Sequence, residues 1–314
     1  MTQSDDRFGA NWPSVGLRVN RCSAYSSDVR WVLGSLVLAG CGRLHFDPHD
    51  DAAACPRPML DFGPPPTQPF NAPVVVAELT STGGEDDPTL TGDELEIYFQ
   101  STRGGSSRIW RSVRATKTAP WPTPEPVSEL DGSPWNTPEL SRDGLRMTLE
   151  LNADIYITSR ADRTSPWRSP VLVQELTTTS NESGAVEFLS GTGIALASDR
   201  PGGNSLGDVW ETFRDPVDCT LTTARVAAGV APTTNVWMRD DGLVLVFPGP
   251  GATGAGDLGF ATRASLDGSF GPYVELTTLN SGGVDDDPWL DDAMTSIYFM
   301  SARTGQVLIY HATR

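Results

Sequence analysis

The chain has 314 residues, with 40 Asp or Glu against 23 Lys or Arg, and its formal net charge at pH 7 is −17. Such an acidic chain lacks the basic surface of a nucleic-acid-binding protein, so we expect no nucleic-acid partner. It contains 31 Gly and 25 Pro, while 38% of its residues are hydrophobic. This mixture indicates a turn-rich globular protein with a core and excludes a disordered acidic chain.

A short apolar segment near the N-terminus has the layout of a secretory signal. Residues 31–40 are apolar or small, follow Arg30 and end before Cys41. No run of about 20 apolar residues exists, so we expect no transmembrane helix. The letters Leu-Ala-Gly-Cys at 38–41 resemble a bacterial lipobox, which implies that residues 1–40 are removed and that Cys41 carries a lipid. The alternative is a buried hydrophobic helix that ends in a cysteine.

The residues around this segment predict how the chain reaches a membrane. The long polar stretch before Arg30 indicates a translation start nearer Val29. Residues 41–69 are rich in Asp, Ala and Pro, a composition typical of a disordered tether. Residues 1–40 carry four Arg and three Asp, which leaves −18 on the remainder, so a covalent lipid would be needed to hold it at an anionic membrane. Gly42 is not the Asp that often retains lipoproteins at the inner membrane, so the resemblance implies the outer membrane, facing the periplasm or the exterior.

Two cysteines, Cys55 and Cys219, remain after this processing. In a compartment that permits disulfides they could form a bridge between tether and domain, or remain two unpaired hydrophobic residues. The chain has no Cys-x-x-Cys, and its three histidines do not form a metal-ligand pattern. We therefore expect no cofactor and assign no metal site.

Three patterns repeat with a period of about fifty residues. In the first, an aromatic residue precedes Pro by three positions and Glu-Leu by eight, as at Phe70, Trp121 and Trp167. The second places Arg after an apolar pair, at Arg114, Arg160, Arg214, Arg263 and Arg314. The third is Ile-Tyr-Phe-x-Ser-x-Arg at 97–103 and 297–303, with a looser copy at 195–200. Such a period indicates a repeat architecture.

Each unit contains four short β-rich runs separated by Gly, Pro, Asp and Asn. We therefore predict an all-β protein, a five-bladed β-propeller of four-stranded blades, over residues 70–314. The blades are expected at 85–130, 136–176, 182–228, 234–276 and 285–314. The last unit stops after three strands, and segment 70–79 matches the missing outer strand, so we expect it to close the ring. The alternative is an open β-sandwich or a two-domain β protein.

The repeats resemble those of the TolB type, a WD40-like propeller family. The similarity rests on Asp-Pro-x-Leu-Thr-x-Asp at 87–93, on Tyr-Phe-x-Ser-x-Arg at 98–103 and 298–303, and on Asp-Ile-Tyr at 154–156. TolB has six blades and an additional α/β domain, which this chain lacks. The resemblance therefore implies the propeller fold and only a loose expectation of a role in envelope complexes.

Charged residues recur at one rim of the predicted channel. The candidate ligand rim consists of Glu85, Asp86, Asp87, Arg103, Arg200, Asp285, Asp286, Asp287 and Arg303. Because these groups recur in several blades, we favour a structural interpretation in which each arginine binds an adjacent carboxylate and a carbonyl. The functional interpretation is a polar or cation-binding rim. Trp135, Trp237 and Trp289 could stack on a ligand, although blade packing explains them better.

No catalytic motif accompanies these repeats, so we assign no catalytic residue and expect a non-enzymatic protein. The leading hypothesis is a lipid-anchored, monomeric binding or scaffolding propeller of the bacterial envelope, with a protein or glycan partner. The alternative is a five-bladed glycosidase with paired channel carboxylates, for which Glu139 and Glu187 are the inner-strand candidates. A calcium site on the acidic rim is a third hypothesis.

Overall fold

The computed structural model describes residues 55–203, 207–227, 235–249, 251–252 and 256–314. The predicted signal segment and Cys41 lie outside these ranges. Within them, the regular structure consists of twenty strands and three short 3-10 helices, η1 (Ala77–Leu79), η2 (Ser128–Leu130) and η3 (Leu189–Gly191). No helix in this part of the chain is long and apolar enough to cross a membrane.

The strands form five four-stranded antiparallel sheets, which confirms the predicted fold class. In the first four blades the order from the channel outward follows the chain. Blade one contains β2 (Glu85–Leu90), β3 (Glu96–Ser101), β4 (Arg108–Val113) and β5 (Glu125–Pro126). Blade two contains β6 (Asn136–Leu140), β7 (Arg146–Leu151), β8 (Asp154–Ser159) and β9 (Val171–Leu172). Blade three contains β10 (Glu182–Phe188), β11 (Gly193–Ser198), β12 (Asp208–Phe213) and β13 (Arg225–Val226).

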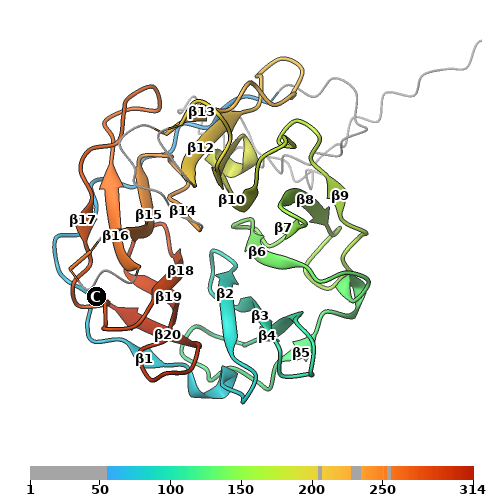
Figure 1. Cartoon of the computed structure of the whole chain (residues 1–314), viewed down its shortest axis with the longest axis vertical. Helices are drawn as coiled ribbons and strands as arrows, with labels where there is room; N and C mark the ends of the chain where they lie inside the picture. Colours follow the sequence, from blue (N-terminus) through green and yellow to red (C-terminus); the bar gives the residue numbers. More distant parts are fainter. Residues whose placement is uncertain (1–54, 204–206, 228–234, 250, 253–255) are drawn as a thin grey trace, which may run out of the picture. The chain divides into compact units, whose positions relative to one another are not determined.

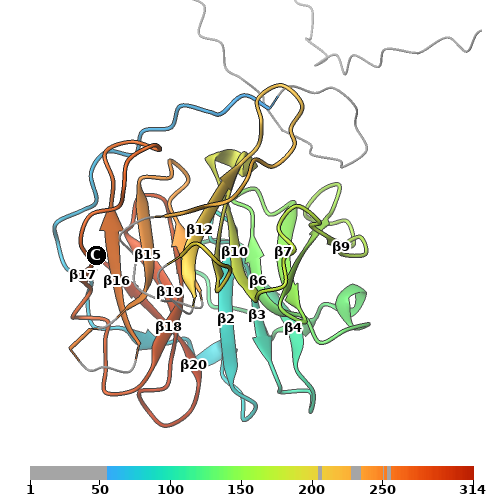
Figure 2. The ribbon, with the colours of Figure 1, turned by 45° about the horizontal axis from the view of Figure 1, so that its top comes forward.

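Blade five differs from the other four blades in how its outer strand is supplied. Blade four contains β14 (Trp237–Met238), β15 (Val244–Gly249), β16 (Asp257–Thr262) and β17 (Val274–Glu275). Blade five contains β18 (Asp285–Leu290), β19 (Ser296–Ser301) and β20 (Leu308–Thr313), and its outer strand is β1 (Val74–Val75) from the opposite end of the sequence. The sheets form a ring with β2, β6, β10, β14 and β18 nearest its centre (Figure 1), and Figure 2 shows the same ribbon turned by 45°.

Blade five joins the two ends of the propeller. Val74 pairs with His311 and Val75 with Tyr310, and the amide of Val76 donates to the carbonyl of Ile309 at 2.9 Å. The regular strand is much shorter than the predicted segment 70–79, because η1 begins at Ala77. β1 supplies hydrogen-bond partners for part of the outer edge of β20, which could otherwise pair with a strand of another chain.

Four of the five inner strands carry a β-bulge. The pairing shifts after Asp86, Asn136, Ser183 and Asp286. At each bulge one residue has a positive φ: Asp87 (49°), Thr137 (42°), Gly184 (55°) and Asp287 (51°). In three blades proline follows this residue. Proline has no backbone N–H to donate, and a bulge leaves one residue outside the hydrogen-bonded ladder, so proline is tolerated there.

Large side chains fill the space between neighbouring sheets. One core cluster contains Phe99, Trp237, Trp289 and Phe299 from blades one, four and five. Trp135 is also buried and meets Tyr156 edge-on, with ring centroids 5.1 Å apart. The three tryptophans considered as stacking platforms are therefore core residues, as the packing interpretation expected.

The repeated arginines explain two sequence patterns with one interaction. Arg114, Arg160, Arg263 and Arg314 lie 4.0–4.5 Å over the rings of Trp121, Trp167, Phe270 and Phe70, respectively. Each arginine also donates through Nε to a turn carbonyl of its own blade: those of Glu94, Gly144, Gly242 and Met294. The arginine and the aromatic residue therefore form one stacked unit that holds the outer link of a blade against its middle strands.

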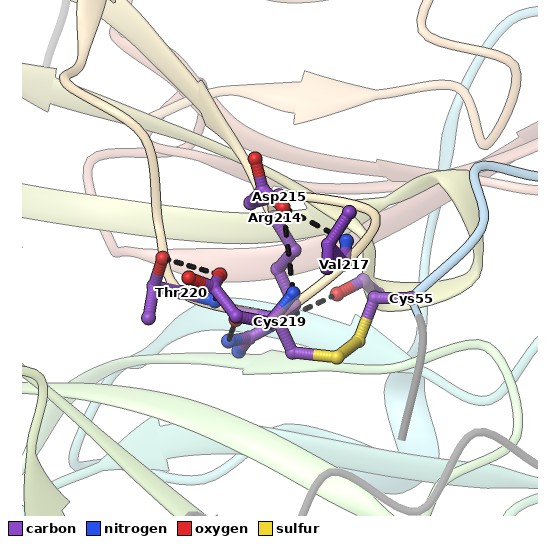
Figure 3. Close-up of a disulfide and its surroundings, with 8 residues drawn as sticks. Cys55, Arg214, Asp215, Val217, Cys219 and Thr220 are labelled. Carbon is purple, nitrogen blue, oxygen red and sulfur yellow. Dashed lines mark hydrogen bonds between the residues drawn. A yellow bond between two sulfur atoms is a disulfide. The ribbon is translucent and has the colours of Figure 1, made fainter. Parts of the chain in front are cut away.

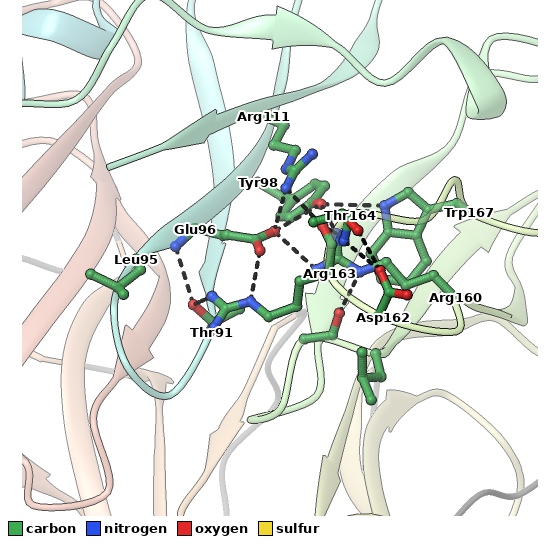
Figure 4. Close-up of polar contacts among 12 residues, drawn as sticks. Thr91, Leu95, Glu96, Tyr98, Arg111, Arg160, Asp162, Arg163, Thr164 and Trp167 are labelled. Atoms are coloured by element: carbon green, nitrogen blue, oxygen red, sulfur yellow. Dashed lines mark hydrogen bonds and ion pairs between the residues drawn. The ribbon is translucent and has the colours of Figure 1, made fainter. Parts of the chain in front are cut away.

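Buried charge also links neighbouring blades. At the seam between blades one and two, the Glu96 carboxylate accepts from Arg160 at 2.9 Å and from Arg163 at 2.7 Å (Figure 4). The hydroxyl of Tyr98 accepts from Arg160 at 3.0 Å, and burial raises the pKa of this tyrosine to about 12. The seam between blades three and four has a comparable pair, Arg263 and Glu211, at 2.8 Å. These paired charges fix adjacent sheets relative to each other.

A disulfide between Cys55 and Cys219 holds the segment before β1 (Figure 3). The amide of Cys55 also donates to the carbonyl of Pro216 at 3.1 Å. Residues 55–69, expected to belong to a disordered tether, contain no helix or strand, yet Arg314 donates to the carbonyl of Gln68 at 3.0 Å. The sequence left open whether these cysteines are bridged or unpaired, and in the structure they are bridged.

Candidate functional site

The predicted ligand rim divides into two groups in the structure. In the first, each arginine that follows a second strand binds the carboxylate that begins the inner strand of its own blade. These pairs are Arg103–Glu85 at 3.0 Å, Arg200–Glu182 at 3.1 Å and Arg303–Asp285 at 2.8 Å. The arginines also donate to the carbonyls of Leu79, Leu176 and Leu279, which precede the same inner strands. Five predicted rim residues, Glu85, Arg103, Arg200, Asp285 and Arg303, therefore stabilise their own blades.

The second group faces the channel. Carboxylate oxygens of Asp86, Asp87 and Asp287 all lie within 4.8 Å of one another, although they come from β2 and β18 of neighbouring blades. We call these three residues the channel cluster. Asp286, the remaining rim residue, acts electrostatically on both Asp87 and Asp287. The bulges explain the convergence, since the left-handed residue leaves the regular alternation of the strand.

Two polar residues that the sequence analysis did not select complete the cluster. The amide of Asn235 donates to the carboxylates of Asp287 and, at 3.4 Å, Asp87. The backbone amide of Thr137 donates to Asp87 at 3.3 Å. The available signal was the repeat itself, because Thr137-Pro138 in blade two corresponds to Asp87-Pro88 and Asp287-Pro288.

The electrostatics of the cluster disfavour ionised carboxylates. Burial raises the pKa of Asp87 well above its usual value, and the charge of Asp86 raises it further, while the hydrogen bond from Thr137 lowers it. The pKa of Asp287 is raised well above its usual value by burial and then by the charge of Asp87. Three carboxylates brought this close require a proton or a cation between them.

Glu139 lies next to the cluster on β6. Burial and the nearby charge of Asp87 raise its pKa well above the usual value, although the Thr89 hydroxyl donates to it at 3.2 Å. Glu187, the other inner-strand candidate, is bound instead by Arg146 at 2.8 Å. Of the two carboxylates considered for catalysis, Glu139 has the raised pKa that suits a general acid, whereas Glu187 is paired with an arginine.

Arg142 crosses the channel at its other end. It follows β6, whereas Thr137 lies near the start of that strand, so the two residues occupy opposite ends of the channel. Its guanidinium donates to the carbonyls of Glu187 and Met238, at 3.0 and 2.6 Å, and to the carboxylate of Asp292 at 3.1 Å. Because these partners belong to blades three, four and five, one side chain joins four of the five blades.

Comparison with known proteins identifies similarity of fold alone. No protein-family profile and no curated protein matches the sequence. The α-L-arabinofuranosidase PaAbf62A from Podospora anserina, solved with cellotriose, has a TM-score of 0.52 at 12% identity, over 78% of this chain and 95% of that chain. The GH62 α-L-arabinofuranosidase of Coprinopsis cinerea has a TM-score of 0.53 at 9% identity, over 78% and 96%. TolB from Acinetobacter baumannii has a TM-score of 0.46 at 15% identity, over 76% of this chain and 56% of TolB.

Proposed function

We propose that this chain is a lipid-anchored, non-enzymatic propeller that acts as a binding or scaffolding module in the bacterial cell envelope. Its binding surface would be the acidic channel mouth, formed by Asp86, Asp87, Asp286 and Asp287, and the loops around it. Its partner would be an envelope protein or glycan. The disulfide supports a location outside the cytoplasm, because such bonds persist in oxidising compartments.

The observation that carries the proposal is the crowding of the channel cluster. Glycosidases keep their two carboxyl groups about 5–5.5 Å or about 6.5–9.5 Å apart, flanking the bond that is cleaved. Here three carboxylates have oxygens within 4.8 Å, and the Asn235 amide donates to two of them. A crowded cluster of three carboxylates held by one amide favours binding over hydrolysis.

Partner capture from envelope extracts tests the binding surface. We expect an immobilised D87N/D287N variant to lose partners that the unmodified protein retains, because the double change removes two carboxyl groups from the mouth. Asp267→Asn is the matched control, since Asp267 is 92% exposed and lies in blade four. Identical partners for the double variant and the unmodified protein would contradict a role of the mouth in binding.

The anchor is tested by metabolic labelling with a fatty acid. We expect label on the unmodified chain and none on Cys41→Ser, because the lipid is attached to that thiol. Cys22→Ser is the control and should retain the label, since Cys22 belongs to the segment that is removed. Label that persists on Cys41→Ser would refute the lipobox interpretation.

A glycosidase is the alternative function, and one observation favours it. Glu139 is a half-buried residue with a strongly raised pKa beside Asp87, a combination that could serve as acid and base. The test is incubation of purified protein with a glycan panel that includes arabinofuranosides. Our proposal predicts no hydrolysis. Hydrolysis that Glu139→Gln abolishes, with the fold intact by circular dichroism, would establish the enzyme instead.

A further inference from the structure

We propose that Asp86, Asp87 and Asp287, together with the hydroxyl of Thr137, bind one divalent cation at the channel mouth, with Ca²⁺ preferred over Mg²⁺. Carboxylate and hydroxyl oxygens are the ligands of such hard cations. The inference goes beyond the proposed function and stands without it, since a cation could serve a binding protein or an enzyme equally.

The geometry of the carboxylates fits one ion. Their oxygens lie within 4.8 Å of one another, and they come from two blades that a shared ligand would join. Two oxygens on opposite sides of Ca²⁺ are about 4.6–5.2 Å apart, because each lies about 2.3–2.6 Å from the ion. Mg²⁺ usually keeps several waters and is bound by only one or two carboxylates, so a site of three carboxylates and a hydroxyl favours Ca²⁺.

Thr137 supplies an independent observation. Its side chain is only 9% exposed, yet its Oγ1 has no hydrogen-bond partner among the described residues. It occupies in blade two the bulge position of Asp87 and Asp287, with a similar left-handed backbone, so its side chain is directed toward the same part of the channel. A buried hydroxyl without a hydrogen bond is destabilising, and coordination to a cation would remove this cost.

The charge environment distinguishes this cluster from five other buried acids. Glu85, Glu182, Glu187, Glu211 and Asp285 each form an ion pair with an arginine. The charges that act most strongly on Asp87 and Asp287 are instead those of neighbouring carboxylates, Asp286 among them. A divalent cation would supply the positive charge that arginines provide elsewhere in the ring.

Calorimetric titration of the purified protein with CaCl₂ and with MgCl₂, after dialysis against a chelator, tests the site. We expect one Ca²⁺ per chain, at least tenfold weaker binding of Mg²⁺, and a rise in Tm with Ca²⁺. Asp87→Asn and Asp287→Asn should each weaken Ca²⁺ binding at least tenfold. Thr137→Val, which keeps the shape and removes the hydroxyl, should weaken it about threefold or more. Asp267→Asn, with the same change in charge on an exposed residue, should bind like the unmodified protein.

Thermal unfolding in chelator separates lost binding from lost folding. The two asparagine variants should unfold at the same or a higher temperature than the unmodified protein, because each removes repulsion between carboxylates. Absence of Ca²⁺ binding by the unmodified protein would overturn the proposal and indicate carboxyl groups that share protons. If folded Asp87→Asn and Asp287→Asn bind Ca²⁺ as tightly as the unmodified protein, the proposal would also be overturned. The titration would then report an adventitious ion only, bound elsewhere on the surface. Equal affinity for the two metals would overturn the preference for Ca²⁺.

Discussion

Asp87 and Asp287 share an uncommon backbone conformation with Thr137, which is a residue of quite different chemistry. A left-handed non-glycine residue costs about 1–3 kcal/mol, so the conformation persists only where the surrounding structure enforces it. Its recurrence in blades one, two and five indicates that the bulge belongs to the repeat. The side chain at the bulge position can therefore differ between blades. In the neighbouring blades one and five this side chain is an aspartate.

The candidate site could be predicted only in part from its residues. The acidic triplets at 85–87 and 285–287 marked the mouth, and the arginine pairing of Glu85 and Asp285 followed from its repetition. Thr137 could have been found only by aligning Thr137-Pro138 with Asp87-Pro88, and nothing in a single asparagine pointed to Asn235. Which carboxylate of a triplet faces the channel also depends on the shift in register, which sequence periodicity does not specify.

Arg163 offers a test of the seam between blades one and two. It binds Asp93 at 2.6 Å and Glu96 at 2.7 Å. Although burial raises the pKa of Asp93, the hydrogen bond from Arg163 and those from Thr91 and Leu95 lower it to about 2. Arg163→Gln should therefore lower the free energy of unfolding at pH 7 by about 1–3 kcal/mol, measured by denaturant titration.

The pH dependence of this loss of stability follows from the lowered pKa of Asp93. An acid whose folded pKa is lowered stabilises the fold above its unfolded pKa of about 4, and this stability is lost as the pH falls toward about 2. The difference between Arg163→Gln and the unmodified protein should thus shrink between about pH 4 and pH 2. A difference independent of pH over this window would show that Arg163 acts through packing alone.

The blade is the element that the sequence predicted best. Three repeat patterns gave the blade boundaries, and the structure shows why two of them recur together: the arginine stacks on the aromatic residue. Blade three is the exception, since Arg214 donates to the carbonyl of Cys219 at 3.1 Å and the disulfide lies at this place. The sequence could not decide the bridge, because its two cysteines are 164 residues apart.

Closure of blade five should dominate stability. Deleting residues 70–79 removes β1 and the buried side chains of Phe70 and Leu79, so we expect aggregation or a large loss of stability. Cys219→Ser removes the bridge but retains β1, and it should cost about 2–5 kcal/mol while the protein stays folded. Circular dichroism and size-exclusion chromatography distinguish these results. A deletion variant that folds and unfolds like the unmodified protein would contradict closure by β1.

The two ends of the channel differ in their charged side chains. At one end Arg142 reaches the strands and turns of three other blades, and its pKa is raised because Asp292 and Asp240 outweigh the effect of burial. At the other end the channel cluster brings carboxylates together. The net charge of −17 predicted an acidic protein but not this polarity, which depends on how the blades close around one axis.

The most direct test of the acidic mouth as a cation site is anomalous diffraction from crystals soaked in Mn²⁺, a divalent ion that also binds oxygen ligands. We predict one strong anomalous peak at the channel mouth, within about 2.0–2.6 Å of oxygens from Asp87 and Asp287. Ca²⁺ added in excess should displace it. Manganese found only on the outer surface, with the mouth empty, would contradict the account.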